Sequence, residues 1–408
     1  MRKSSEASLV RHVVLAWLAI GVAGCDAAAR EWVIEPEVGA ITSAASACAQ
    51  AQERFAVPTD NPRCPDGTYR GDVVLTESQV DPLRGCVHIE GDVRVAPSLV
   101  SLPALANLEC VTGDVVLGPD TGAGALRDLR GLEALRSVRT LRIQNLPELV
   151  NLQGLSALEA AERIEIRGCE SLASLDGLAA LREVRGRLRL ARNATFVSLS
   201  GAPQLRTLGE LVLDDNPALE DLQGLPRELS QLMALSIERN ASLLTLDGVE
   251  ALTDIRYLFV SDNPRLERLA YFQNLRHVET LEVADHPQLT ELGALPALED
   301  HAELELTLRN NTRLASLHGL EPITQAYNVS VTGNAALSDL SAWRIQHVHN
   351  FMALSSNDSL TSLDGLGALR NAAWLRIQAN PRLRDLDALS QLQRGGVLEL
   401  RNNLSLRP

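Results

Sequence analysis

Residues 211–217 have the sequence Leu-Val-Leu-Asp-Asp-Asn-Pro, and this short phrase recurs along most of the chain. Its Asn position falls at residues 146, 169, 193, 216, 240, 263, 286, 311, 334, 357, 380 and 403. Successive positions differ by 23, 24, 23, 24, 23, 23, 25, 23, 23, 23 and 23 residues. A register this constant predicts a repeat architecture and not a set of separate globular domains.

The spacing inside one repeat predicts its local structure. After Asn357, apolar side chains follow at every third residue from Leu360 to Ala372, and the repeat ends on Leu375 and Ile377 with one polar residue between them. That final alternation is typical of a short strand. Steps of three favour tight turns or a single helical turn over a long amphipathic helix. Each repeat is therefore expected to be one coil of a solenoid that folds only by stacking on its neighbours.

The Asn position is expected to face the interior. A buried turn leaves backbone groups unpaired, and a carboxamide offers both donors and an acceptor to satisfy them. The predicted internal ladder consists of Asn193, Asn216, Asn240, Asn263, Asn311, Asn334, Asn357, Asn380 and Asn403. Four of these, Asn193, Asn240, Asn357 and Asn403, match the glycosylation sequon, which we interpret as a by-product of the repeat.

Residues 1–24 predict an export signal, with Arg2, Lys3 and Arg11 ahead of an apolar run that is too short to span a bilayer. The run ends in Val-Ala-Gly before Cys25, which resembles the bacterial lipobox. That resemblance implies lipid attachment at Cys25 and a location in the bacterial cell envelope, on the outer membrane or the periplasmic face of the inner membrane. The alternative is an ordinary cleavable signal. Residues 25–63 are interpreted as a tether and residues 64–408 as the solenoid.

The net charge limits the partners. The 408 residues carry a formal charge of −14, and Lys occurs only at Lys3. A nucleic-acid partner is not expected, because binding phosphates requires a basic face. Anionic headgroups would repel the body of the protein, so membrane contact is expected only through the lipid anchor.

The repeat resembles leucine-rich repeats, and the N-terminal edge resembles the receptor L domain. The matching stretch is Cys-Val-His-Ile-Glu-Gly-Asp-Val-Arg-Val at residues 86–95, followed by Val-Thr-Gly-Asp-Val-Val-Leu at residues 111–117. The resemblance covers about residues 64–408. It implies a mainly β, right-handed parallel β-solenoid whose sheet face meets protein or glycan partners. This chain departs from the family in running about 14 continuous coils of ~23 residues.

The resemblance also implies that Cys86 closes the N-terminal edge by pairing upstream, with Cys64 as its partner. Five cysteines follow Cys25, so at least one thiol must be unpaired. Cys169 occupies an Asn position of the repeat, and we expect it to be a buried thiol.

Two stretches of outward positions form the candidate binding surface. Acidic residues gather over four coils and could hold Ca²⁺ or attract a cationic partner, although an ordinary soluble acidic face is the alternative. Small polar residues on the following coils predict a flat strip, and Phe259 could anchor an interface. The candidate residues are Asp214, Asp215, Glu238, Phe259, Asp262, Glu282, Asp285, Thr307, Ser330, Thr332 and Ser355.

No catalytic site or cofactor is expected. The chain has no nucleophile elbow and no Gly-rich phosphate loop. His347 and His349 look like a metal pair, but the period assigns His349 to an inward position. We therefore expect a lipid-anchored envelope recognition module that binds protein or glycan through its sheet face. The alternatives are a passive envelope scaffold and a polysaccharide-cleaving solenoid enzyme that uses the acidic cluster.

Overall fold

The computed structural model describes residues 61–76, 83–102, 105–269, 271–338 and 340–407. All of them belong to the second of two compact units, Ile41–Pro408. The expected export signal, Cys25 and most of the expected tether lie outside the described residues. No helix within the described ranges is both long enough and apolar enough to cross a membrane.

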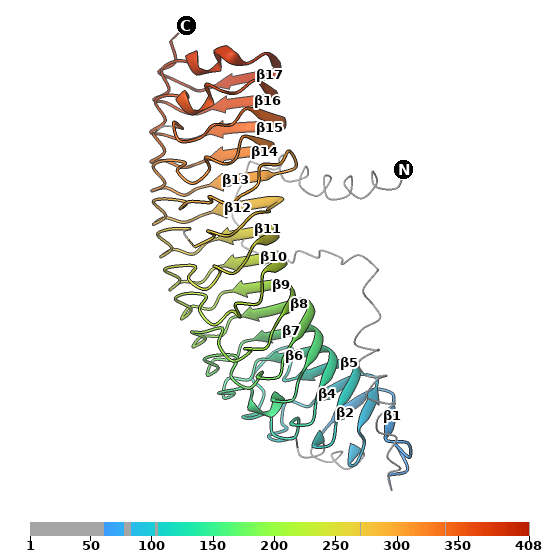
Figure 1. The fold of residues 1–408 in the computed structure, drawn as a ribbon. Coiled ribbons are helices and arrows are strands. Elements are labelled where there is room, and N and C mark those ends of the chain that lie inside the picture. The colour runs from blue at the N-terminus through green and yellow to red at the C-terminus, as the bar shows by residue number, and fades with distance from the viewer. Residues whose placement is uncertain (1–60, 77–82, 103–104, 270, 339, 408) are drawn as a thin grey trace, which may run out of the picture. The chain divides into compact units, whose positions relative to one another are not determined.

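The described residues form one parallel sheet of 17 strands (Figure 1). The strands are β1 (Thr68–Arg70), β2 (Val73–Leu75), β3 (His88–Glu90), β4 (Val93–Val95), β5 (Cys110–Leu117), β6 (Ser137–Gln144), β7 (Ala160–Arg167), β8 (Glu183–Ala191), β9 (Thr207–Asp214), β10 (Gln231–Glu238), β11 (Asp254–Ser261), β12 (Thr280–Ala284), β13 (Glu305–Arg309), β14 (Gln325–Thr332), β15 (His347–Ser355), β16 (Asn371–Gln378) and β17 (Arg394–Arg401). Short 3-10 helices also occur at η3 (Gln153–Leu155), η4 (Asp364–Leu366) and η5 (Asp387–Gln391).

From β5 onward each strand pairs with the strand of the next coil, one repeat later. Leu235 of β10, for example, lies between Leu211 of β9 and Leu258 of β11. This ladder confirms a mainly β, parallel β-solenoid of about 14 turns with about 23 residues in each turn. The first two coils differ, because each divides its strand into two short segments. These are β1 with β2 and β3 with β4, and β5 pairs with both β3 and β4.

The apolar positions of the repeat form one continuous core. Leu360, Leu363, Leu366 and Leu369 are all buried, as the steps of three predict. Gly365, which directly precedes Leu366, has a steric role. A Cβ added to Gly365 would lie 1.6 Å from the carbonyl oxygen of Leu340 in the preceding coil. The close stacking of the coils therefore requires glycine at this point.

The predicted Asn ladder is present. The backbone N–H of Asn311 donates to Oδ1 of Asn334 at 3.0 Å, and Nδ2 of Asn334 donates to the carbonyl oxygen of Leu308 at 3.0 Å. Equivalent bonds link the neighbouring coils from Cys169 to Asn403. Each side chain thus satisfies a buried donor and a buried acceptor of the preceding coil, which the solenoid interior could not leave unpaired. His286 occupies one of the ladder positions.

The N-terminal edge carries the disulfide that the resemblance implies. Cys64 and Cys86 are bonded, with their Cα atoms 5.8 Å apart. Cys110 is also disulfide-bonded. Cys169 is a free thiol buried in the core, and burial raises its pKa to about 12.

The expectation for His349 is wrong. Val348 takes the inward position, and His349 is exposed. The register of β14, β15 and β16 shifts at this point, between Val348 and Phe351 on β15. The bulge adds one residue between Val348 and Phe351, so the inward position falls one residue early, at Val348. The side chains after the bulge keep the register of the neighbouring coils, as Met352 does with Val329 and Leu375.

Candidate binding surface

The outward face of the sheet is organised in columns that run across successive coils. One column contains Val212, Ser236, Phe259, Glu282, Thr307 and Ser330. The adjacent column contains Asp214, Glu238, Ser261, Ala284, Arg309, Thr332 and Ser355. The structure therefore brings most of the residues predicted from the sequence onto two neighbouring columns between β9 and β15.

The acidic cluster differs from the expectation at Asp214. This carboxylate is only 5% exposed, because Arg189 pairs with it at 3.1 Å and Arg239 pairs with its other oxygen. Arginines also neutralise other members of the cluster. Glu238 lies 3.1 Å from Arg239, and Asp285 lies 2.7 Å from Arg309. Sequence reasoning missed these partners because it selected the acidic residues alone, although Arg309 shares a column with Asp214 and Arg239 directly follows Glu238.

Three acids of the cluster have a backbone role. Asp215, Asp262 and Asp285 have φ angles of 55°, 56° and 63° at the turn that follows each strand. Asp and Asn tolerate this left-handed conformation better than most residues. Within the described residues, no group of three or more His, Cys, Asp or Glu could hold a metal ion. The left-handed turn position is thus compatible with these acids, and the same position holds Arg239 and Ala379 in other coils.

The predicted strip of small residues is present on β13 to β15. Thr307, Ser330, Thr332 and Ser355 are all half-buried on the outward face. The hydroxyls of Ser330 and Thr332 lie 3.3 Å apart. Phe259 is half-buried in its column and presents only part of its ring.

A third column contains an aromatic cluster that the sequence reasoning missed. Phe351 on β15 is followed in register by Trp374 on β16 and Val397 on β17. The two rings meet edge to face with centroids 5.5 Å apart. Phe351 is 8% exposed, whereas Trp374 is 42% exposed, so one ring supports the other at the surface.

Arg376 fixes this cluster from the next column. Its guanidinium carbon lies 5.2 Å from the centroid of Trp374 and 5.5 Å from that of Phe351. Its Nε lies 2.8 Å from Glu399. The hydrogen bond and positive charge of Arg376 lower the pKa of the Glu399 carboxyl, to which Trp374 also donates. Trp and Arg are the residues that most often dominate binding energies at interfaces.

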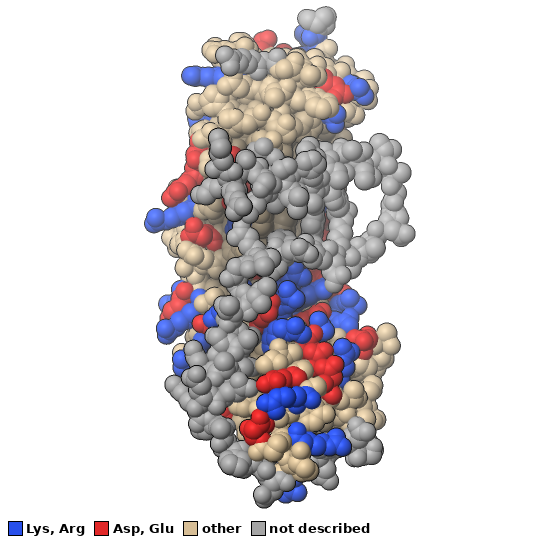
Figure 2. Space-filling model, turned by 90° about the vertical axis from the view of Figure 1, so that its right-hand side faces the viewer, with Lys and Arg blue, Asp and Glu red and all other residues tan. Residues whose placement is uncertain are grey.

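Charge is unevenly distributed over the face that Figure 2 shows. In the view of Figure 2, side chains of both signs intermix over the N-terminal coils, whereas the C-terminal coils present a mostly uncharged area. Alternating ion pairs explain the first region, as with Arg187 and Glu210 at 2.7 Å. Such pairs fix side chains but contribute little each where solvent reaches them.

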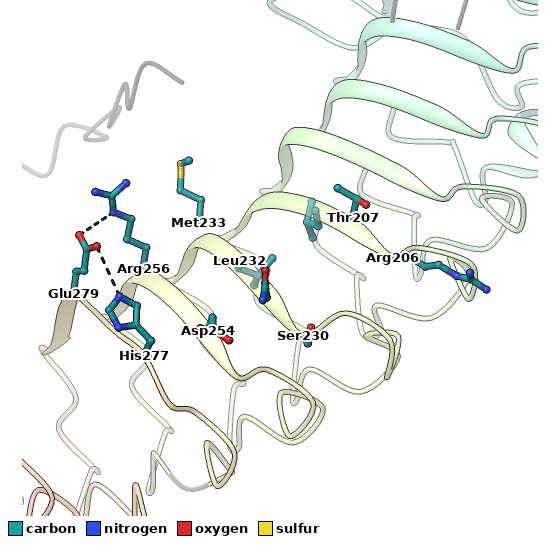
Figure 3. A pocket seen from close by; sticks show the side chains of 11 residues that line it. Arg206, Thr207, Ser230, Leu232, Met233, Asp254, Arg256, His277 and Glu279 are labelled. Atoms are coloured by element: carbon teal, nitrogen blue, oxygen red, sulfur yellow. Dashed lines mark hydrogen bonds and ion pairs between the residues drawn. The ribbon is translucent and has the colours of Figure 1, made fainter. Parts of the chain in front are cut away.

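A groove of about 520 Å³ lies over the first residues of β9 to β12 (Figure 3). Its walls expose polar and apolar surface in about equal parts, and it was not predicted. The lining residues are Arg206, Thr207, Leu208, Ser230, Gln231, Leu232, Met233, Asp254, Arg256, His277 and Glu279. Arg256 and His277 converge on Glu279, at 2.8 Å and 3.8 Å.

The groove coincides with a break in the repeat. The strands β9 to β11 have eight residues each, whereas β12 and β13 have five. Upstream of β12, only a single bridge between Asp254 and His277 continues the ladder. The coil from residue 286 to residue 311 is also the one with the longest spacing. A depression therefore forms where the regular stacking of strand ends stops.

Comparisons with known proteins leave the family open. No family model matches the chain, and no curated protein matches it. Among solved structures, the chain is similar to one described as the crystal structure of the TLR13-ssRNA13 complex, with 14% identity and a TM-score of 0.29. The alignment covers 82% of this chain and 66% of that chain, slightly less than two thirds of its length. The parallel ladder itself therefore carries the fold assignment.

Proposed function

We propose that this protein is a lipid-anchored recognition module of a bacterial cell envelope, similar to receptor L domains, and that it binds a protein or glycan partner through its sheet face. The observation that carries the proposal is the exposed indole of Trp374, held between Phe351 and Arg376. An exposed aromatic side chain that is already fixed loses little conformational freedom on binding. The cluster therefore has the composition and rigidity of an interface anchor.

The lipid anchor and the envelope location rest on the signal-like residues 1–24 and on Cys25. Incorporation of labelled palmitate, followed by cell fractionation, tests both. Native protein should carry label and sediment with membranes, and Cys25→Ala should carry none and appear in the soluble fraction. Label that persists in Cys25→Ala would refute the anchor.

Binding is proposed without catalysis. Asp262 and Glu282, the carboxylates of an enzyme alternative, lie in a turn and on the sheet face respectively. A passive scaffold remains the competing function, and it predicts no saturable ligand. Polysaccharide degradation that is lost in Asp262→Ala or Glu282→Ala would instead support the enzyme.

An array of envelope proteins and glycans tests the sheet-face proposal. The native chain should bind a component saturably, and Trp374→Ala should weaken that binding at least tenfold, as expected for a central aromatic anchor. Val150→Ala removes another exposed apolar side chain, outside the sheet, and should leave binding unchanged. No saturable component, or equal effects of the two variants, would refute the role of Trp374.

A further inference from the structure

The groove over β9 to β12 has the properties of a second, independent binding site. Its volume of about 520 Å³ falls within the usual range of ligand sites, roughly 300–1,000 Å³. It crosses four adjacent coils, which at about 4.8 Å per strand gives a length of roughly 14 Å. That length is greater than one sugar ring or one amino-acid side chain, so the groove suits a short stretch of polymer.

The balance of charges in the groove does not favour a strongly ionic ligand. It contains two arginines, Arg206 and Arg256, and two carboxylates, Asp254 and Glu279, so the formal charges cancel when His277 is neutral. Arg256 is already paired with Glu279 at 2.8 Å. A phosphate or sulfate would meet Asp254 in the same groove, and a cation would meet Arg206.

The remaining polar groups suit hydroxyls. Thr207 and Ser230 contribute hydroxyls and Gln231 contributes an amide, and each of these groups can both donate and accept a hydrogen bond. Sugar hydroxyls have the same dual character. Met233 is 37% exposed at the groove and offers a polarizable apolar surface for the C–H face of a sugar ring.

The periodicity of the wall adds to this match. Thr207, Gln231 and Asp254 begin β9, β10 and β11, and His277 pairs with Asp254 just before β12. Polar groups therefore recur at the strand spacing along the groove. A polymer with repeating hydroxyl groups can meet such a wall at several points. The lining contains no Phe, Trp or Tyr, unlike the aromatic anchors that typify protein interfaces.

From these observations we propose that the groove over β9 to β12 binds an uncharged polysaccharide segment. The residues assigned to it are Thr207, Ser230, Gln231, Met233, Asp254 and Arg256. This site is separate from the Trp374 cluster on β16, so the proposal does not depend on the partner of the sheet face.

Calorimetric titration of the purified full-length chain with tetrasaccharides tests the proposal. The probes are neutral linear tetramers of glucose, mannose and N-acetylglucosamine, with tetragalacturonate and inorganic phosphate as charged comparators. At least one neutral tetramer should bind saturably and with little dependence on salt. Absence of saturable binding by every neutral tetramer, or tighter binding of a charged comparator, would overturn the proposal.

Matched variants locate the site. Gln231→Ala should weaken the binding about two- to tenfold, the usual effect of losing a hydrogen bond. Gln288→Ala removes an exposed side chain of the same type that does not line this groove and should leave the affinity unchanged. Asp254→Asn keeps a hydrogen-bonding group without charge and should retain binding. Equal losses in Gln231→Ala and Gln288→Ala would place the sugar elsewhere.

One further variant separates this proposal from the sheet-face function. Trp374→Ala should leave tetrasaccharide affinity unchanged, because the indole does not line the groove. A Trp374→Ala chain that loses the tetrasaccharide would assign the sugar to the sheet face and overturn the groove.

Discussion

His286 Nδ1 accepts a hydrogen bond from the backbone N–H of Asn263 at 3.2 Å, and its Nε2 lies 3.1 Å from the carbonyl oxygen of Val260. The imidazole thus replaces both functions of a ladder Asn, provided that it is neutral and carries its proton on Nε2. Burial lowers the pKa of His286, although hydrogen bonds to Asn263 and Val260 oppose the shift. Nδ1 also lies 3.1 Å from the carbonyl oxygen of Asn263, which a proton on Nδ1 could meet. That proton would end the hydrogen bond that Nδ1 accepts from the N–H of Asn263, so acid should disrupt this one joint of the ladder.

His286→Asn should reduce the acid sensitivity of the solenoid. An unfolded His titrates near pH 6.5, and the buried His has a lower pKa, so the unfolded state binds more protons as pH falls through about 6.5. Stability from this group is present above that pH and is lost below it. Thermal unfolding at pH 7.5 and pH 5.5 should show a smaller drop in Tm for His286→Asn than for native protein. His349→Asn, at an exposed position, should show the same drop in Tm as the native protein. Equal drops in Tm for all three proteins would contradict the ladder role of His286.

Asn334→Ala should destabilise the middle of the solenoid by about 2–5 kcal/mol, because it leaves the N–H of Asn311 and the carbonyl of Leu308 buried without partners. Urea unfolding followed by far-ultraviolet circular dichroism measures the change. Thr312→Ala alters a neighbouring exposed side chain and should shift the curve by less than about 0.5 kcal/mol. A small effect of Asn334→Ala would mean that water replaces the carboxamide.

Removal of the Cys64–Cys86 disulfide should loosen the N-terminal coils selectively. The bond closes a loop with a sequence separation of 22, so its loss should cost roughly 3 kcal/mol. In a repeat protein each coil is stabilised mainly by its contacts with the adjacent coils. In Cys64→Ala/Cys86→Ala, amide hydrogen exchange should therefore accelerate in β1 to β4 and stay unchanged in β14 to β16. Uniform acceleration would show that the solenoid unfolds as one unit.

Cys169 should resist alkylation in the folded protein. Its thiol is buried, and its pKa of about 12 leaves almost no reactive thiolate at pH 8. Mass spectrometry after iodoacetamide treatment should find Cys169 unmodified in native protein and fully modified in guanidinium. Rapid labelling without denaturant would show that the core opens at this coil.

The repeating positions of the solenoid could be predicted from the sequence because each depends on a fixed offset along the chain. Asn216 and Leu363 face the core for reasons that one coil repeats in the next. The same offset wrongly predicted an inward position for His349, because an extra bulged residue on β15 changes the register locally. A period alone cannot place a residue where hydrogen bonding between strands inserts one more.

The surface depends on neighbours that occupy unrelated positions in the sequence. The sequence pattern predicts that Asp214 is an exposed acid, but Arg189 and Arg239 from the coils on either side bury and neutralise it. Trp374 becomes an anchor only because Phe351 and Arg376 lie against it. These contacts could not be predicted from the sequence, because the residue at an outward position varies from coil to coil.

The amino-acid sequence by itself determined the coil length, the apolar interior and the column of buried carboxamides, because every coil must satisfy the same backbone groups in the same way. Tertiary structure alone decided which charges are neutralised, where Trp374 is held and where the groove opens over β9 to β12. Those features arise from contacts between coils at positions under no repeated constraint, and from the local shortening of β12 and β13.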